Sequence, residues 1–117
     1  MASANKIIER VDALRPNVFD DLDKGRWILE IEGRIYSEIL KKDFSLRFPE
    51  DGDRELSLPE QYSNVYEYYL YAMMDWHNRE FTEYNNDFLM FNSAWESMRR
   101  HFVKNNAKGT RFVNVVP

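Results

Sequence analysis

The residues of this chain whose spacing comes closest to that of a catalytic site are three carboxylates. Glu80, Glu83 and Asp87 follow one another at steps of three and four, which places them along one strip of a helix. Carboxylates in such a row can act as general acids and bases. Acids are also favoured by the helix macrodipole at an N-terminus, and a solvated helix start explains these three better.

Other residues with reactive side chains form no recognisable site. No Glu-x-x-His pair accompanies His77 or His101, and Asp75 and His77 point to different sides of a helix. Zero cysteines exclude disulfides, thiolate metal sites and cysteine nucleophiles. Serines lack a nucleophile elbow, and the four glycines form no phosphate-binding loop. The sequence therefore predicts no enzymatic activity, no cofactor and no metal.

Charge divides the chain into an acidic body and a basic end. Of the sixteen basic residues five lie from residue 99 onward, where no acid occurs, so the first 98 residues hold the other eleven and all twenty acids. The five are Arg99, Arg100, Lys104, Lys108 and Arg111. Cations stabilise a helix C-terminus, and they can also bind the acidic body of another copy. If the basic end contacts DNA at all, the contact should be nonspecific and sensitive to salt.

An aromatic stripe predicts the helix that carries the basic end. Its members recur at steps of three and four: Phe81, Tyr84, Phe88, Phe91, Trp95, Met98 and Phe102. Each contributes roughly 2 kcal/mol when removed from water, so the stripe is expected to be buried. The same steps occur after Pro59 at Tyr62, Tyr66, Tyr69, Met73 and Trp76. Because the break between the two stripes is short, the two helices should form an antiparallel hairpin.

Two more helices are predicted in the first 42 residues. Ser3 is a suitable cap for the first, and Pro16 ends it. Its apolar face consists of Ile7, Ile8, Val11 and Leu14. The second begins after an acidic turn, ends near Lys42 and has a stripe of Ile28, Ile31, Ile35 and Ile39. Gly33 inside it is expected to permit close approach of another backbone.

The expected fold is mainly all-α, a single four-helix domain over residues 1–117 built on the antiparallel hairpin. Residues 43–59 should form a long loop or a small β-hairpin. Residues 109–117 should form an extended apolar tail that seeks a sheet edge, either in this chain or in another subunit. No apolar run spans a bilayer, and residues 1–17 carry charges where a signal peptide is apolar, so a soluble, unexported chain without a membrane partner is expected.

Tyrosines and the basic end are the candidates for a protein interface. Tyr68 and Tyr71 fall off the core stripe, and exposed tyrosines anchor many interfaces. The positions of Tyr68 and Tyr71 are explained equally well if both rings belong to a wide core stripe and only their hydroxyls reach water. The predicted interface residues are Arg99, Arg100, Lys104, Arg111, Phe112, Val113, Tyr68 and Tyr71.

Several short segments occur in an order that is shared with one known family. They are Ile8–Asn17, Trp27–Tyr36, Leu58–Tyr62, Tyr66–Leu70 and Glu83–Asn86. In this order the chain resembles the head-tail connector, or adaptor, proteins of tailed phages and prophages of Gram-positive bacteria. The resemblance implies a helical, non-enzymatic structural protein that assembles as a ring below the portal, extends the DNA channel and seats the next tail-proximal protein.

The resemblance also implies partners and a location. The partners would be the portal protein and tail-proximal virion proteins, in the virion and, during assembly, in the cytoplasm of the bacterial host. A head-to-tail interface closes into a ring, so we expect the basic end or the tail to meet the acidic loop or second helix of a neighbouring copy. An isolated copy can still be a monomer. The alternative function is a small cytoplasmic protein-binding or regulatory, antitoxin-like module.

Overall fold

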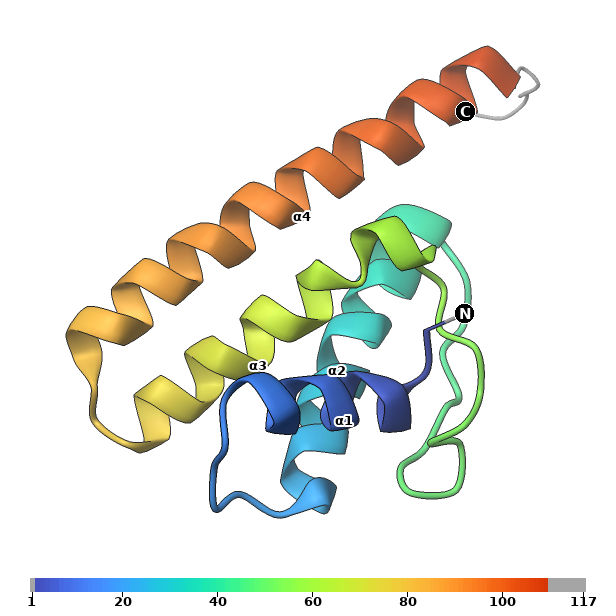
Figure 1. The fold of residues 1–117 in the computed structure, drawn as a ribbon. Helices are drawn as coiled ribbons and strands as arrows, with labels where there is room; N and C mark the ends of the chain where they lie inside the picture. Colours follow the sequence, from blue (N-terminus) through green and yellow to red (C-terminus); the bar gives the residue numbers. More distant parts are fainter. Residues whose placement is uncertain (1, 110–117) are drawn as a thin grey trace.

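Four α-helices make up most of the structure, a computed structural model that describes residues 2–109, with side chains as far as residue 104. They are α1 (Ala4–Leu14), α2 (Asp21–Ile35), α3 (Asn64–His77) and α4 (Phe81–Gly109) (Figure 1). A π-helical turn, Tyr36–Leu40, extends α2, and a short 3₁₀ helix, Glu60–Tyr62, precedes α3. Among the described residues there is no strand. The predicted mainly helical fold is therefore confirmed.

Local signals set the ends of the helices. The Ser3 side chain accepts a hydrogen bond from the backbone N–H of Lys6 over 3.3 Å and so caps α1. The helix ends before Pro16, as predicted. Asp21 and Asp23 lie in the first turn of α2, where the macrodipole stabilises carboxylates. No described helix has both the length and the apolar composition needed to cross a membrane.

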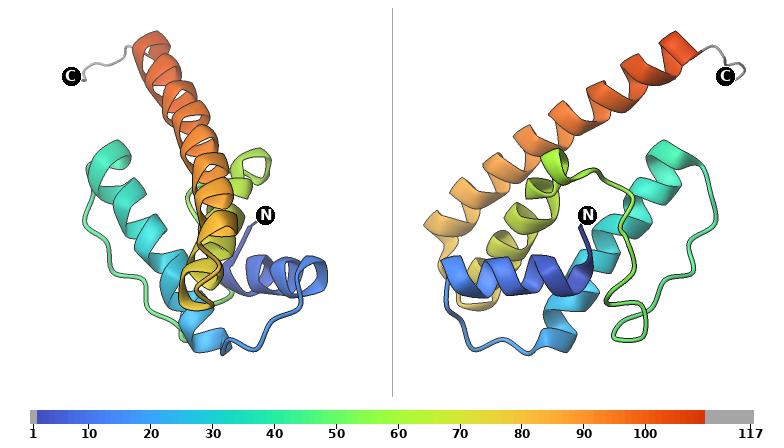
Figure 2. Two further views of the ribbon diagram at one scale, coloured as in Figure 1. Left: turned by 90° about the vertical axis from the view of Figure 1, so that its left-hand side faces the viewer. Right: turned by 45° about the vertical axis from the view of Figure 1, so that its right-hand side comes forward.

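α3 and α4 form the predicted antiparallel hairpin (Figures 1 and 2). Phe91, Trp95 and Met98 are buried on α4, and the Phe91 ring centroid lies 5.4 Å from that of Tyr69 on α3. α3 also packs against α1 and α2 on its other sides. α4 packs mainly against α3, and its last turns extend beyond the other helices (Figures 1 and 2).

Burial of the aromatic stripe is limited to its central and C-terminal part. Phe81, the first residue of α4, is 50% exposed, and so is Trp76, whose ring centroid lies 5.4 Å away. The prediction of burial was therefore wrong at Phe81, because this residue lies at the turn of the hairpin, beyond the packed middle of the two helices. Leu14 is exposed for a similar reason, since it is the last residue of α1.

Residues 41–59 form a long loop, and the hairpin alternative is not formed. The loop pairs instead with the start of the chain: the Leu56 N–H donates to the Ala2 carbonyl, and the Asn5 N–H donates to the Gly52 carbonyl, each over 2.9 Å. An isolated antiparallel bridge joins Ser3 to the same part of the loop. Because two strands alone are marginal in water, pairing with residues that α1 already holds is the more stable arrangement.

No backbone approaches Gly33 closely as expected; the tight contact on α2 is at Gly25, and an aromatic ring makes it. A Cβ atom added at Gly25 would lie only 2.3 Å from the ring of Phe48, a loop residue. At Gly33 the nearest atom belongs to the ring of Phe44 and lies 3.4 Å away, which is ordinary contact. The expectation for Gly33 was therefore wrong, because the loop meets α2 through aromatic side chains and not through its backbone.

Candidate functional site

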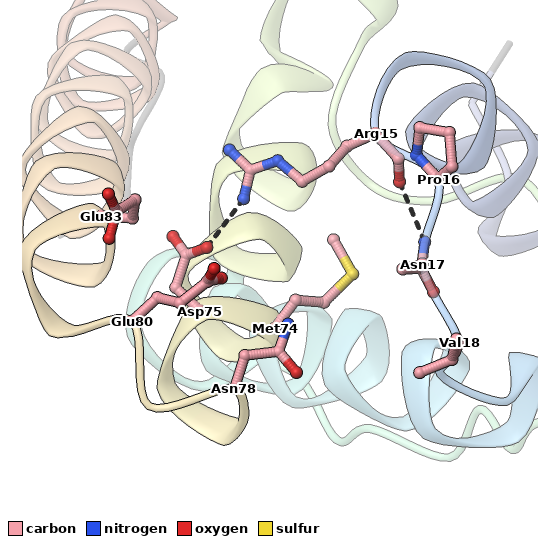
Figure 3. A pocket seen from close by; sticks show the side chains of 9 residues that line it. All are labelled: Arg15, Pro16, Asn17, Val18, Met74, Asp75, Asn78, Glu80 and Glu83. Carbon is pink, nitrogen blue, oxygen red and sulfur yellow. Dashed lines mark hydrogen bonds and ion pairs between the residues drawn. The ribbon is translucent and has the colours of Figure 1, made fainter.

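A pocket of about 470 Å³ lies where the end of α1, the C-terminal end of α3 and the start of α4 meet (Figure 3). The residues that give it chemistry are Arg15, Asp75, Glu80 and Glu83. Val18 and Met74 add apolar surface. The pocket therefore joins three carboxylates to one guanidinium, from segments far apart in the sequence.

Arg15 links α1 to both helices of the hairpin. Its two terminal nitrogens donate to Asp75 on α3 and to Asp87 on α4, each over 2.9 Å. Its guanidinium carbon also lies 4.2 Å from the ring centroid of Tyr71. Asp75 is 3% exposed. A planar guanidinium suits this role because it can donate to two carboxylates and stack on an aromatic ring at once.

Asp75 carries a second oxygen that the fold does not satisfy. Oδ2 is buried and has no hydrogen-bond partner among the described residues. Burial, with the neighbouring carboxyl of Asp87, raises the pKa of Asp75 to about 7, although the positive charge of Arg15 acts in the opposite direction. The charge of Asp75 therefore changes near neutral pH.

We expect Asp75→Asn to reduce the pH dependence of stability. The folded-state pKa of about 7 lies above the ordinary 3.8, so the folded state binds this proton more tightly and the free energy of unfolding falls as pH rises between these values. Asparagine retains an oxygen for Arg15 without the charge. At about pH 8 the variant should be more stable than the native chain by roughly 1–4 kcal/mol, and below about pH 5 this advantage should shrink.

Urea unfolding of both chains at the two pH values measures this difference. Glu50→Gln is the matched control, because Glu50 is an exposed loop carboxylate that should change stability little at either pH. If Asp75→Asn changes the free energy of unfolding by the same amount at both pH values, then Asp75 does not bind its proton more tightly in the folded chain than in the unfolded chain.

The basic end of α4 is exposed. Arg99 forms an ion pair of 3.0 Å with Glu96, one turn earlier on the same helix. Within the described part of the chain, no carboxylate forms an ion pair with Arg100 or Lys104. Val103 beside them is 55% exposed. At 1.5 Å per helical residue, this end lies about 30 Å from the pocket at the start of α4.

The remaining predicted interface residues divide into two groups. Tyr68 and Tyr71 are half-buried and pack against the core, with ring centroids 6.3 Å apart. Their packing fits the interpretation of a wide core stripe with hydroxyls near water. Arg111, Phe112 and Val113 lie outside the described residues, as does almost all of the predicted tail over 109–117. The structure brings Tyr71 to the pocket through Arg15, but it joins neither tyrosine to the basic end.

Sequence reasoning missed Arg15 and Asp75. Asp75 lies one turn after Ala72 on a buried part of α3, and a carboxylate at a buried helical position is the signal that could have indicated a special role. Arg15, the partner of Asp75, lies 60 residues away in the sequence, so no spacing rule identifies the pair. Asp87 was interpreted as solvated, which is wrong, because its side chain is 17% exposed and paired with Arg15.

The pocket has the chemistry to hold a positively charged group or to exchange a proton. A carboxyl with a pKa near 7 suits general acid–base catalysis, but the pocket lining includes no side-chain hydroxyl, thiol or imidazole that could act as a nucleophile. Among the described side chains, no three carboxylates or histidines are grouped so that they could hold a metal ion.

Comparisons of the chain with protein-family models, with curated proteins and with solved structures found no match. Function is therefore inferred from the residues, their arrangement and the resemblance described above.

Proposed function

We propose that this chain is a non-enzymatic structural protein of a tailed phage or prophage, which assembles as a ring below the portal and joins head to tail. The observation that carries the proposal is the separation of charge along α4. Carboxylates surround its first turns, and Arg100 and Lys104 near its other end form no ion pair with a described residue. Two complementary surfaces at opposite ends of one subunit favour a head-to-tail contact, which closes into a ring when the rotation permits.

The surface of α4 supports an assembly role. Leu89 and Met90 are 66% and 48% exposed, although the helix buries Phe91 next to them against α3. These two neighbouring apolar side chains would leave water if another molecule covered them, which would stabilise such a contact. The resemblance to head-tail connectors, which extends over most of the chain, supports the same function.

The proposed partners are the portal protein and the tail-proximal virion proteins. The protein would act in the virion and, during assembly, in the cytoplasm of the bacterial host. Ring formation would take place on the portal, so an isolated copy can be a monomer. Contact with the packaged DNA would be limited to nonspecific attraction between the basic end and phosphates.

Size-exclusion chromatography with the portal protein of the same phage or prophage tests the proposal. We expect the chain to co-elute with the portal in a complex larger than the portal alone. An Arg100→Glu, Lys104→Glu double variant should retain its helical content, because both side chains are exposed, but fewer copies should bind each portal. Separate elution of chain and portal at every mixing ratio would contradict the proposal and favour the antitoxin-like binding module.

A further inference from the structure

The pocket at the α3–α4 turn carries negative charge that the described residues of its own chain do not balance. Arg15 is the one cation among its lining residues, and it is already paired with Asp75 and Asp87. Glu80 and Glu83 line the same pocket, and neither forms an ion pair with a described residue (Figure 3). The buried Oδ2 atom of Asp75 adds an acceptor that has no hydrogen-bond partner among the residues that the structure describes. A cationic group supplied from outside would complete this arrangement.

Resting on the ring assembly proposed above, the geometry points to this pocket as the receptor for an arginine or lysine side chain from the basic end of α4 in a second copy. Arg100 and Lys104 are exposed cations without an ion pair to a described residue. α4 is one continuous helix, so these side chains remain about 30 Å from the pocket of their own chain. The contact must therefore form between copies, with the end of one α4 against the start of the next.

Apolar side chains border both halves of the proposed contact. Val18 lines the pocket and is 93% exposed, and Val103 lies between the two cations with 55% exposure. The stem of an arginine or lysine side chain packs on apolar surface while its charged group reaches carboxylates. The two valines can therefore meet at the edge of a contact whose centre is ionic.

Several acids on the loop and on the predicted second helix, which the sequence suggested as the acceptor, are already paired within the chain. On the loop, Asp51 pairs with Arg54, and in the π-helical turn after α2, Glu38 pairs with Arg34. Asp21 lies 3.5 Å from Lys24. Asp43 and Glu50 on the loop have no ion pair with a described residue, but both are exposed. The pocket adds the buried Oδ2 atom of Asp75 to its carboxylates, so a cation from a second copy gains more there than at an exposed acid.

Cysteine cross-linking tests the contact directly, because the chain has no cysteine of its own. Val18→Cys and Val103→Cys are made as two separate proteins and treated with a short bismaleimide, alone and mixed, both free and with the portal. We expect cross-linked dimers in the mixture at several times the yield of either protein alone. A mixture that gives no more dimer than the single proteins, both free and on the portal, would overturn the assignment.

Charge reversal identifies the acceptor. Glu83→Arg, added to the Val18→Cys protein, should lower the yield of the mixed dimer several-fold. Glu50→Arg is the matched control, because it makes the same charge change on the loop and should leave the yield unchanged. A loss caused by Glu50→Arg and not by Glu83→Arg would place the acceptor on the loop instead of in the pocket.

The two proposals fail in different ways. Co-elution with the portal without a Val18–Val103 cross-link would leave the connector function in place and disprove the pocket contact. A mixed dimer that forms in free solution, combined with no binding to the portal, would support the contact between copies and disprove the connector function.

Discussion

Replacing Glu32 by alanine should lower the free energy of unfolding by about 3–5 kcal/mol. Glu32 lies on α2 and is completely buried. Its carboxylate accepts hydrogen bonds from the Ser57 N–H over 2.7 Å, from the Ser57 hydroxyl over 2.9 Å and from the Tyr66 hydroxyl over 2.6 Å. Alanine would leave the buried Tyr66 hydroxyl and two partly buried Ser57 donors unpaired, and each buried group without a partner costs roughly 1–3 kcal/mol.

The hydroxyl of Tyr66 is a dependable donor in this network. Burial and the adjacent carboxylate of Glu32 raise the pKa of Tyr66 well above its ordinary value, so the phenol stays protonated throughout the neutral range. The same hydroxyl accepts a hydrogen bond from the Leu58 N–H over 3.3 Å. Glu32 therefore holds the end of the long loop against both α2 and α3, and its loss should also expose loop amides to hydrogen exchange.

Glu30→Ala is the matched control for Glu32→Ala. Glu30 lies on the same helix and also accepts a tyrosine hydrogen bond, from Tyr69 over 2.8 Å, but it does so at the surface. We expect its replacement to cost about 1 kcal/mol or less in urea unfolding. Equal losses for the two variants would show that the buried network contributes no more than one exposed hydrogen bond.

Phe91→Ala should lower the free energy of unfolding by about 3–5 kcal/mol, the usual cost of removing a buried phenylalanine side chain. Phe91 is 1% exposed, and its ring centroid lies 5.4 Å from that of Tyr69 and 6.0 Å from that of Trp95. Because α4 packs mainly against α3, little other contact can compensate for the cavity. Circular dichroism during urea unfolding measures the loss.

Leu89→Ala is the control for this second prediction. Leu89 lies two residues earlier on α4 and is 66% exposed, so its replacement should change stability by about 0.5 kcal/mol at most. A large loss for Leu89→Ala, or a small one for Phe91→Ala, would mean that α4 is oriented differently on α3 in solution.

The helices and the hairpin could be predicted from the sequence because their signals are local. Residues three and four positions apart share a helix face, and Ser3 and Pro16 act on their immediate neighbours. The loop path could not be predicted in the same way. Glu32 and Ser57 are 25 residues apart, and their pairing depends on how complete helices pack.

The same distinction applies to the candidate site. The basic end could be predicted from the sequence because its five cations lie within thirteen residues and no acid lies among or after them. The pocket could not be predicted from the sequence, because Arg15 and Asp87 lie 72 residues apart and meet only after α1 packs on the hairpin. The strip of carboxylates was recognised, but its division into exposed Glu80 and Glu83 and paired Asp87 depends on that packing.

Native mass spectrometry of the chain bound to its portal tests the proposed ring most directly. A ring that closes by head-to-tail contacts should appear as one fixed number of copies, well above one, on each portal assembly. Partly filled assemblies should be scarce, because each added copy gains a contact with its neighbour. A single bound copy, or independent filling without a preferred number, would contradict the proposal that this chain is a ring-forming connector.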